Sequence, residues 1–338
     1  MSFRIPSPFL KLMLTALIIV VALAALAVVA TIHIGAKRLI TPKRCPLEPR
    51  HNQLLETPAE HGLALEPHDV TMPDGIVLRS ILATRSTAPG TAKKTVRMEK
   101  RLADAGVKPQ EECRGTVILL HGRGGLKENL LSVAQRFVAA RYRCIVYDAR
   151  THGTSEGKFC TFGTREKEDL REMLQFYRSL IKERGENFGQ LCAFGYSLGG
   201  AVILQSLEDE NGIDVIIASA TFADLAPIIE RSIDRNLHPL LPNWIRNQAI
   251  KRGGRIAGFD PLSIEPIKSV RVSTTPLFIV HGERDGVIPI DHSRRLFEAA
   301  SVPKHLTEIP DAYHSDVLAK GGDDLYEAMI HFCLRQQE

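Results

Sequence analysis

One serine stands in a setting that suits nucleophilic chemistry. The segment Gly195-Tyr196-Ser197-Leu198-Gly199 follows a short apolar run and precedes an apolar, helix-like stretch. This order predicts a buried strand, a sharp turn that presents Ser197, and a helix. Glycine on either side of the turn lets the strand and helix backbones approach each other where a Cβ would clash. Presented in this way, a serine hydroxyl can attack a substrate if a base lies within reach.

Three other segments carry what such a serine would need. One apolar run leads into a polar loop that contains Asp285, and a strand-like run is followed by a loop that contains His314. A histidine can act as the base, and a carboxylate can orient that histidine. The apolar run 116–120 ends in the glycine-rich loop 121–125, where backbone N–H groups could face the negative charge that develops during acyl transfer.

With these segments in this order, the chain resembles an α/β-hydrolase of the serine-hydrolase type. It is similar to esterases and lipases, and also to serine aminopeptidase-like hydrolases. In that family the nucleophile, the acid and the histidine follow one another along the sequence. The likeness runs from Glu66 to the C-terminus and includes the loop 148–157. It implies Ser197 as nucleophile, Asp285 as orienting acid and His314 as base and acid.

The resemblance also implies a set of supporting residues. Backbone N–H groups of Leu198 and Arg123 would form the oxyanion hole, and the dipole of the helix that begins at Leu198 would add to it. The residues expected to shape the surrounding loops are His121, Gly122, His152, Gly195, Gly199 and His281.

Two of these assignments have competitors. After Asp285 the chain has four histidines, of which His292 opens a helix, His305 begins a strand and His331 lies inside the terminal helix. His314 alone among them falls in a strand-to-helix loop, which favours it as the base. Asp224, after the sixth strand, is an alternative acid, because some lipases place the acid there.

Strand-like and helix-like segments alternate through most of the chain. This pattern predicts an α/β-hydrolase fold with a mostly parallel central sheet and helices on both faces. A hairpin over residues 70–85, with its turn at 73–75, would open the fold, and the polar stretch 88–115 is expected to be a solvated excursion. Helical periodicity marks residues 128–141, 165–186, 294–300 and 323–334.

An insertion is expected over about 222–275, between the sixth and seventh strands. It is much longer than such connections need. Its apolar spacing predicts two or more short amphipathic helices, a small helical cap over the mouth of the site. The residues that carry this spacing are Leu225, Ile228, Ile229, Ile233, Leu240, Leu241, Trp244 and Ile245.

The N-terminus carries a separate signal. Residues 12–32 contain no charge, and as a helix they would cross a bilayer core of about 30 Å. We therefore expect a single-pass membrane protein, with a tail and anchor at 1–36, a Pro-containing linker at 37–60 that leaves the enzyme mechanically separate, and the hydrolase domain at 61–338. A cleaved signal peptide is the competing interpretation, but its apolar region usually spans only about 7 to 15 residues.

Other features leave questions open. Basic residues lie on both sides of the apolar span, so the side of the membrane that holds the catalytic domain is not fixed. The six cysteines allow disulfides without requiring them.

Composition excludes several classes of function. A net charge of +4, without long basic runs, gives no sign of nucleic-acid binding. Neither metal-ligand spacing nor a phosphate-binding loop is present in the sequence, so no metal and no cofactor are expected. We therefore expect a membrane-anchored serine hydrolase acting on small or lipid-like carboxylic esters. The alternatives are an amide or peptide hydrolase similar to prolyl oligopeptidases, and a non-catalytic scaffold of the same fold.

Overall fold

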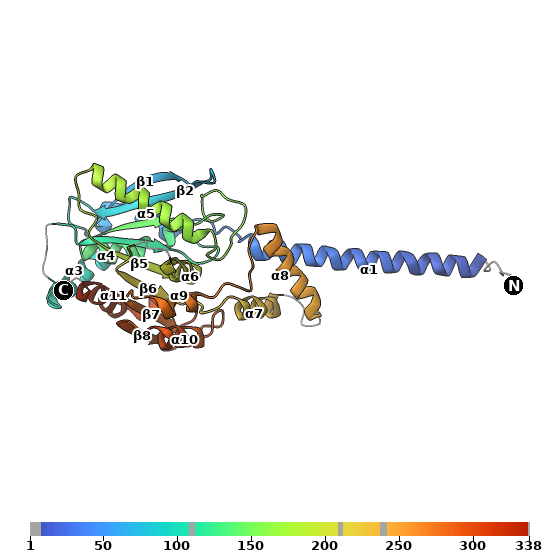
Figure 1. Ribbon diagram of the computed structural model, residues 1–338. Coiled ribbons are helices and arrows are strands. Elements are labelled where there is room, and N and C mark those ends of the chain that lie inside the picture. Colours follow the sequence, from blue (N-terminus) through green and yellow to red (C-terminus); the bar gives the residue numbers. More distant parts are fainter. Residues whose placement is uncertain (1–7, 108–111, 209–211, 237–241, 337–338) are drawn as a thin grey trace.

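A central sheet of eight strands organises the protein (Figure 1). The computed structural model describes residues 8–107, 112–208, 212–236 and 242–336. The strand order is β1-β2-β4-β3-β5-β6-β7-β8, with β1 and β2 antiparallel to their neighbours and the other pairs parallel. The strands are β1 (Leu63–Thr71), β2 (Val77–Arg85), β3 (Gly115–Leu120), β4 (Tyr142–Tyr147), β5 (Gln190–Tyr196), β6 (Val215–Ser219), β7 (Leu277–Gly282) and β8 (Lys304–Ile309).

Helices cover both faces of this sheet. Because side chains alternate along a strand, Ile118 of β3 packs into one apolar core while Val117 and Leu119 pack into the other. Helices α5, α6, α9 and α10 contribute to the first core, and α2, α3, α4 and α11 to the second. The helices are α1 (Pro8–Ile40), α2 (Pro49–Glu56), α3 (Lys93–Asp104), α4 (Leu131–Ala139), α5 (Glu166–Glu183), α6 (Leu198–Gln205), α7 (Ala226–Asn236), α8 (Asn243–Ala257), α9 (Pro266–Val272), α10 (Asp291–Ala299) and α11 (Val317–Arg335). This architecture confirms the predicted fold class.

Most of α1 extends away from the rest of the molecule (Figure 1). The helix has 33 residues and is long and apolar enough to cross a bilayer, and its most apolar stretch has no buried residues. Its last turn differs, because Ala36 and Ile40 are fully buried. These two residues mark the part of α1 that packs on the rest of the protein.

The segment predicted as a separate linker, 37–60, is folded against the domain. The Arg44 guanidinium donates to the backbone carbonyl of Gly153, at 2.8 Å, and the Cys45 N–H donates to the Gly124 carbonyl, at 3.2 Å. Within α2, His51 and Leu54 are buried. The expectation of a mechanically separate enzyme is therefore wrong. A proline-containing stretch looks like a linker locally, but its contacts are with distant loops that the local pattern cannot reveal.

The hairpin and the polar excursion also differ from expectation. β1 begins at Leu63, seven residues before the predicted start of the hairpin. The prediction missed these residues because β1 is the outer strand of the hairpin, and its polar and apolar residues do not alternate regularly. The stretch 88–115 contains α3, whose Thr95, Met98 and Leu102 are buried. These three positions follow helical spacing, but the many charges around them indicated a solvated segment instead.

The predicted helices correspond to α4, α5, α10 and α11, with ends shifted by a few residues. In the insertion between β6 and β7, the described residues include α7, α8 and α9. Leu225, Ile229 and Ile245 are buried there, whereas Trp244 is exposed. Leu240 and Leu241 lie outside the described residues, and so does the side chain of Ile233.

The cysteines are all unpaired: Cys45 and Cys113 are exposed, and the other four are buried.

Candidate active site

Ser197 lies at a strained turn between β5 and α6. Its φ of 53° and ψ of −114° are unusual for a residue with a side chain. The turn is held by two hydrogen bonds: the Ser197 N–H donates to the Ser219 carbonyl at 2.7 Å, and the Thr221 hydroxyl donates to the Ser197 carbonyl at 2.8 Å. A Cβ added at Gly195 would overlap the backbone of Gly200. This close approach explains the glycine before the serine.

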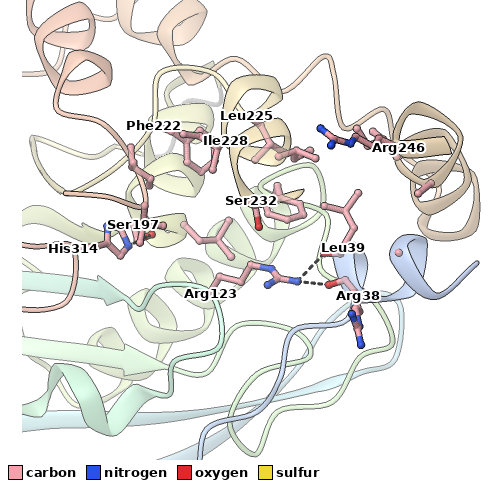
Figure 2. A pocket seen from close by; sticks show the side chains of 18 of the residues that line it. Arg38, Leu39, Arg123, Ser197, Phe222, Leu225, Ile228, Ser232, Arg246 and His314 are labelled. Atoms are coloured by element: carbon pink, nitrogen blue, oxygen red, sulfur yellow. Dashed lines mark hydrogen bonds between the residues drawn. The ribbon is translucent and has the colours of Figure 1, made fainter. Parts of the chain in front are cut away.

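His314 faces Ser197 from the loop after β8 (Figure 2). Its Nε2 lies 3.0 Å from Ser197 Oγ, within hydrogen-bonding distance. The loop is fixed nearby, because the Tyr196 hydroxyl donates to the His314 carbonyl and the Tyr313 N–H donates to Asp316 Oδ1 at 2.6 Å. The neighbour of the serine thus helps to hold the histidine in place.

Asp285 completes the arrangement from the loop after β7. Its Oδ2 lies 2.6 Å from His314 Nδ1, and its Oδ1 accepts the N–H groups of Val287 and Ile288, both at 2.8 Å. Burial raises the pKa of Asp285, but hydrogen bonds from His281 and His314 outweigh it, so the net pKa is well below the ordinary value. The carboxylate is therefore ionised at neutral pH.

The alternative acid, Asp224, is engaged elsewhere. Its Oδ1 lies 2.8 Å from an Arg295 nitrogen and 3.3 Å from His292 Nδ1. Of the two carboxylates considered from the sequence, the structure brings Asp285 to His314.

The loop expected to hold a second oxyanion donor lies against the serine. A Cβ added at Gly122 would stand 3.2 Å from the Ser197 Cβ. His121 Nε2 accepts the Ala149 N–H at 3.1 Å, which leaves Nδ1 to donate to the Gly122 carbonyl at 2.8 Å. Burial lowers the pKa of His121, and these bonds require its neutral form. His121 therefore ties the glycine-rich loop to the loop after β4.

A buried ion pair reinforces that tie. Asp148 Oδ2 lies 2.8 Å from Lys127 Nζ, and its carboxylate also accepts the N–H groups of Lys127 and Thr154, at 2.7 and 2.9 Å. Burial raises the pKa of Asp148, yet the charge of Lys127 and these hydrogen bonds give a net lowering. His152 is buried in the same region, and burial lowers its pKa to about 3. Both histidines are thus neutral supports of the loops, as the resemblance implies.

Arg123 has a second contact that the sequence did not suggest. Its guanidinium donates to the backbone carbonyls of Arg38 and Leu39, at 2.7 and 2.9 Å (Figure 2). These carbonyls belong to the last turn of α1, where helix carbonyls lack partners within the helix. The glycine-rich loop is thereby connected to the N-terminal helix.

A cavity of about 610 Å³ opens from Ser197 and His314. This volume is in the range of small-molecule sites, which is about 300 to 1,000 Å³. Most of the lining is apolar, its charged members are arginines, and no carboxylate lines it within the described part of the chain. The lining residues are Thr31, Gly35, Arg38, Leu39, Arg123, Phe162, Ser197, Leu198, Phe222, Leu225, Ile228, Ile229, Ser232, Ile245, Arg246, Ala249, Ile250, Val287, Ile288 and His314.

Two features of the site were missed or underestimated from the sequence. His281 touches the acid directly, with Nε2 3.2 Å from Asp285 Oδ2 and 2.8 Å from the Ile288 carbonyl, while its Nδ1 lies 2.6 Å from Ser293 Oγ. Its spacing of four residues from Asp285 was the available signal. The contribution of α1 to the cavity had no comparable signal. Among the described residues, no group of three or more His, Cys, Asp or Glu side chains could hold a metal ion.

The fold and this geometry define the class of the protein, and comparisons agree. Residues 111–257 match the family model described as serine aminopeptidase, S33. The chain is 30% identical to the protein YfhR of Salmonella typhimurium over 224 residues, which are 66% of this chain and 72% of the relative. It is 26% identical to a monoacylglycerol lipase of Mycolicibacterium smegmatis over 237 residues, 61% of this chain and 83% of the lipase.

Solved structures share the fold. The Pyrococcus furiosus esterase Pf2001 superposes with a TM-score of 0.63 at 18% sequence identity, over 87% of this chain and 98% of the esterase. The chain belongs to the α/β-hydrolase superfamily, as the resemblance predicted.

Proposed function

We propose that this protein is a membrane-anchored serine hydrolase that cleaves carboxylic esters through an acyl-enzyme, with Ser197, His314 and Asp285 as its catalytic residues. The observation that carries the proposal is the chain of short contacts from Ser197 Oγ to His314 Nε2, at 3.0 Å, and from His314 Nδ1 to Asp285 Oδ2, at 2.6 Å. Nucleophile, base and orienting acid stand in the order that acyl transfer requires.

In the first half-reaction, His314 Nε2 takes the proton of Ser197 as Oγ attacks the ester carbonyl carbon. The carbonyl oxygen becomes negatively charged, and backbone N–H groups of Leu198 and Arg123 are suited to stabilise it. Leu198 is the first residue of α6, so its N–H is free of helical bonding and lies at the positive end of the helix dipole. When the tetrahedral intermediate collapses, the alcohol leaves with the proton from His314 Nε2.

In the second half-reaction, a water molecule gives a proton to His314 and attacks the acyl group on Ser197. The acid product then leaves, and the proton returns to the serine. Asp285 accepts the Nδ1 hydrogen of His314 throughout, which fixes the tautomer and stabilises the imidazolium. The low pKa of Asp285 keeps it in the charged form that this role needs.

The cavity favours an acyl substrate. Its lining beyond the serine is mainly aliphatic and aromatic, which matches a hydrocarbon chain. The 33-residue helix α1 would hold the enzyme on the membrane where such substrates are found. Similarity to a monoacylglycerol lipase and the fold of an esterase support the same class of reaction.

The description of the matching family favours one alternative, aminopeptidase activity. An aminopeptidase must bind a positively charged N-terminal ammonium group. The charged side chains around this cavity are Arg38, Arg123 and Arg246, and no carboxylate joins them among the described lining residues. An ammonium group would be repelled there, so ester cleavage is the better supported reaction. A non-catalytic scaffold would not need the aligned hydrogen bonds of Ser197, His314 and Asp285.

A direct test combines covalent labelling with hydrolysis. Full-length protein in detergent should react with a fluorophosphonate at Ser197 and hydrolyse p-nitrophenyl esters, whereas Ser197→Ala should do neither. Ser232→Ala is the matched control, because Ser232 lines the same cavity and should leave labelling intact. Labelling of Ser197→Ala at the wild-type level would refute the assignment of the nucleophile.

A further inference from the structure

The cavity does not end within the hydrolase fold. From Ser197 and His314 it continues along α7 and α8 to Leu39, near the end of α1 (Figure 2). Thr31 and Gly35 of α1 also line it. These residues are spaced by four along a helix, so they share one face. That face of the N-terminal helix therefore forms a wall of the active-site cavity.

The contact between α1 and α8 is close. A Cβ added at Gly35 would lie 3.2 Å from the Cβ of Ala249, and one added at Gly253 would lie 3.2 Å from the Ala36 carbonyl. Small residues on both helices let the backbones approach, as in packed membrane helices. Ala36 is fully buried in this contact. Small residues on α1 and α8 thus allow the helix to pack closely against the rest of the protein.

The end of α1 is also held by hydrogen bonds from the catalytic face. Arg123 donates to the carbonyls of Arg38 and Leu39, and the Cys160 N–H donates to the Ile40 carbonyl at 2.8 Å. Bonds from charged donors contribute more than neutral ones to holding a contact. The wall formed by α1 is therefore fixed relative to Ser197.

The same helix continues directly into its apolar, exposed part. Side chains such as Leu26 and Val29 are 65% and 55% exposed, as expected for a surface that lies in lipid. Thr31 belongs both to this apolar stretch and to the cavity lining. Trp244, at the start of α8, is 56% exposed, and tryptophan is enriched where proteins meet the membrane surface. The far end of the cavity thus adjoins the membrane segment.

We propose that α1 is part of the substrate-binding site, and that the enzyme takes single-chain lipid esters directly from the bilayer. This inference rests on the proposed function. The ester carbonyl reaches Ser197 while the acyl chain lies along Leu39, Gly35 and Thr31, between α1 and the helices of the insertion. The N-terminal helix then has two roles, anchor and acyl-binding wall.

The first experiment introduces a larger side chain on α1, which makes the far end of the cavity narrower. Full-length Thr31→Phe in phosphatidylcholine vesicles should show kcat/KM for monooleoylglycerol lowered about tenfold, because added bulk fills space that the chain needs. Hydrolysis of p-nitrophenyl acetate should stay within about twofold, since a two-carbon acyl group does not reach Thr31. Val29→Phe is the matched control, two residues away on the exposed side of the helix, and should leave both substrates unchanged.

Thr31→Ala makes the side chain smaller instead of larger, and it tests the proposal even if Thr31→Phe fails to fold. A smaller side chain should shift the preferred acyl length upward in a series of monoacylglycerols. If Thr31→Phe lowers both substrates equally, or if neither Thr31 variant changes chain-length preference, the proposed acyl wall is wrong. Fluorophosphonate labelling of each variant shows whether the catalytic residues are intact.

A second experiment does not depend on turnover. A monoacylglycerol with a diazirine on its acyl chain is bound to Ser197→Ala in vesicles and irradiated. Labelled peptides should contain residues 31–39 and 245–250, and an excess of monoacylglycerol without the diazirine should suppress this labelling, whereas labelling from bulk lipid alone would persist. Labelling confined to the β-sheet loops, or absent from α1, would overturn the inference. If the expected peptides are labelled but the wild-type protein does not hydrolyse the ester, the proposed function is refuted and the binding role of α1 is not.

Discussion

The two ends of the cavity are built in different ways. At one end, Ser197, His314 and Asp285 come from loops at the carboxyl edge of the parallel sheet, and their polar atoms are partnered by neighbouring backbone and side chains. At the other end, mostly apolar residues of α1, α7 and α8 line the cavity outside the sheet, and α1 packs on α8 through small residues.

On the proposed function, the first end would set the geometry of the reaction and the second end the choice of substrate. Ser197 follows β5, whose central residues are buried, and Asp285 follows the fully buried β7, so the packed core of the sheet fixes both positions. The distal walls depend on how three helices dock. We expect changes at the first end to affect all substrates alike, and changes at the second to affect long acyl chains most.

The largest effect is expected at the catalytic end. Asp285→Asn should lower kcat by about 10⁴, because an amide cannot hold the required tautomer of His314. The loss should be the same for short and long esters. Asp224→Asn is the control, since Asp224 pairs with Arg295 instead. A large loss in Asp224→Asn, with Asp285→Asn near wild type, would move the acid to the other loop.

Removal of the N-terminal helix should have an intermediate effect that depends on substrate. A chain that begins at Thr41 lacks the wall at Thr31, Gly35 and Leu39 but keeps α2, so kcat/KM for long-chain esters should fall about 10- to 100-fold. This corresponds to lost contact with two or three methylene groups at about 0.8 kcal/mol each. Short esters should be affected less, as measured with an acyl-length series in detergent. Equal rates for all chain lengths would show that α1 is an anchor only.

A smaller effect is expected when the link between the two ends is cut. Arg123→Leu removes the donors to the Arg38 and Leu39 carbonyls but keeps the backbone N–H at position 123. We expect kcat/KM for long esters to fall about tenfold, as for the loss of a charged hydrogen bond. If p-nitrophenyl acetate hydrolysis falls equally, the side chain positions the oxyanion loop rather than α1.

The smallest expected effect is on the free energy of unfolding. Its dependence on pH should differ between variants at the catalytic end of the cavity and variants at the apolar end. Burial lowers the pKa of His121, and that of His152 to about 3, while unfolded histidine titrates near 6.5. Between these values the unfolded chain binds protons that the folded protein does not, so the free energy of unfolding should decrease as pH falls below about 6.5. The slope is about 1 kcal/mol per pH unit for each such histidine. Asp285 adds to this only below about pH 4, because its lowered pKa loses stability as the pH falls through that range.

Urea unfolding of the full-length protein in detergent, from pH 8 to pH 4, measures this dependence. His152→Gln should make the curve flatter. The variant Thr31→Ala, at the apolar end, should leave the slope unchanged. The same pH dependence in wild type and His152→Gln would contradict the neutral buried state of His152.

The sequence by itself determined the chemistry-bearing loops and the class of fold. The segments around Ser197, Asp285 and His314 could be found because acyl transfer requires particular residue types just after buried strands, and strand-loop-helix patterns are local. The close approach at Gly195 is local as well, since it involves residues five positions apart. His281 was placed in a supporting role, but its contact with Asp285 depends on the loop conformation.

The tertiary structure alone decided how the N-terminal helix relates to the enzyme. Leu26 and Ile40 are both aliphatic, and the type of a residue does not tell that the first is exposed and the second buried. The pairing of Gly35 with Ala249 joins segments more than 200 positions apart, and small residues carry no mark of their partner. Burial of the last turn of α1, and with it the far wall of the cavity, depends on contacts between distant segments, which exist only once the sheet has brought those segments together.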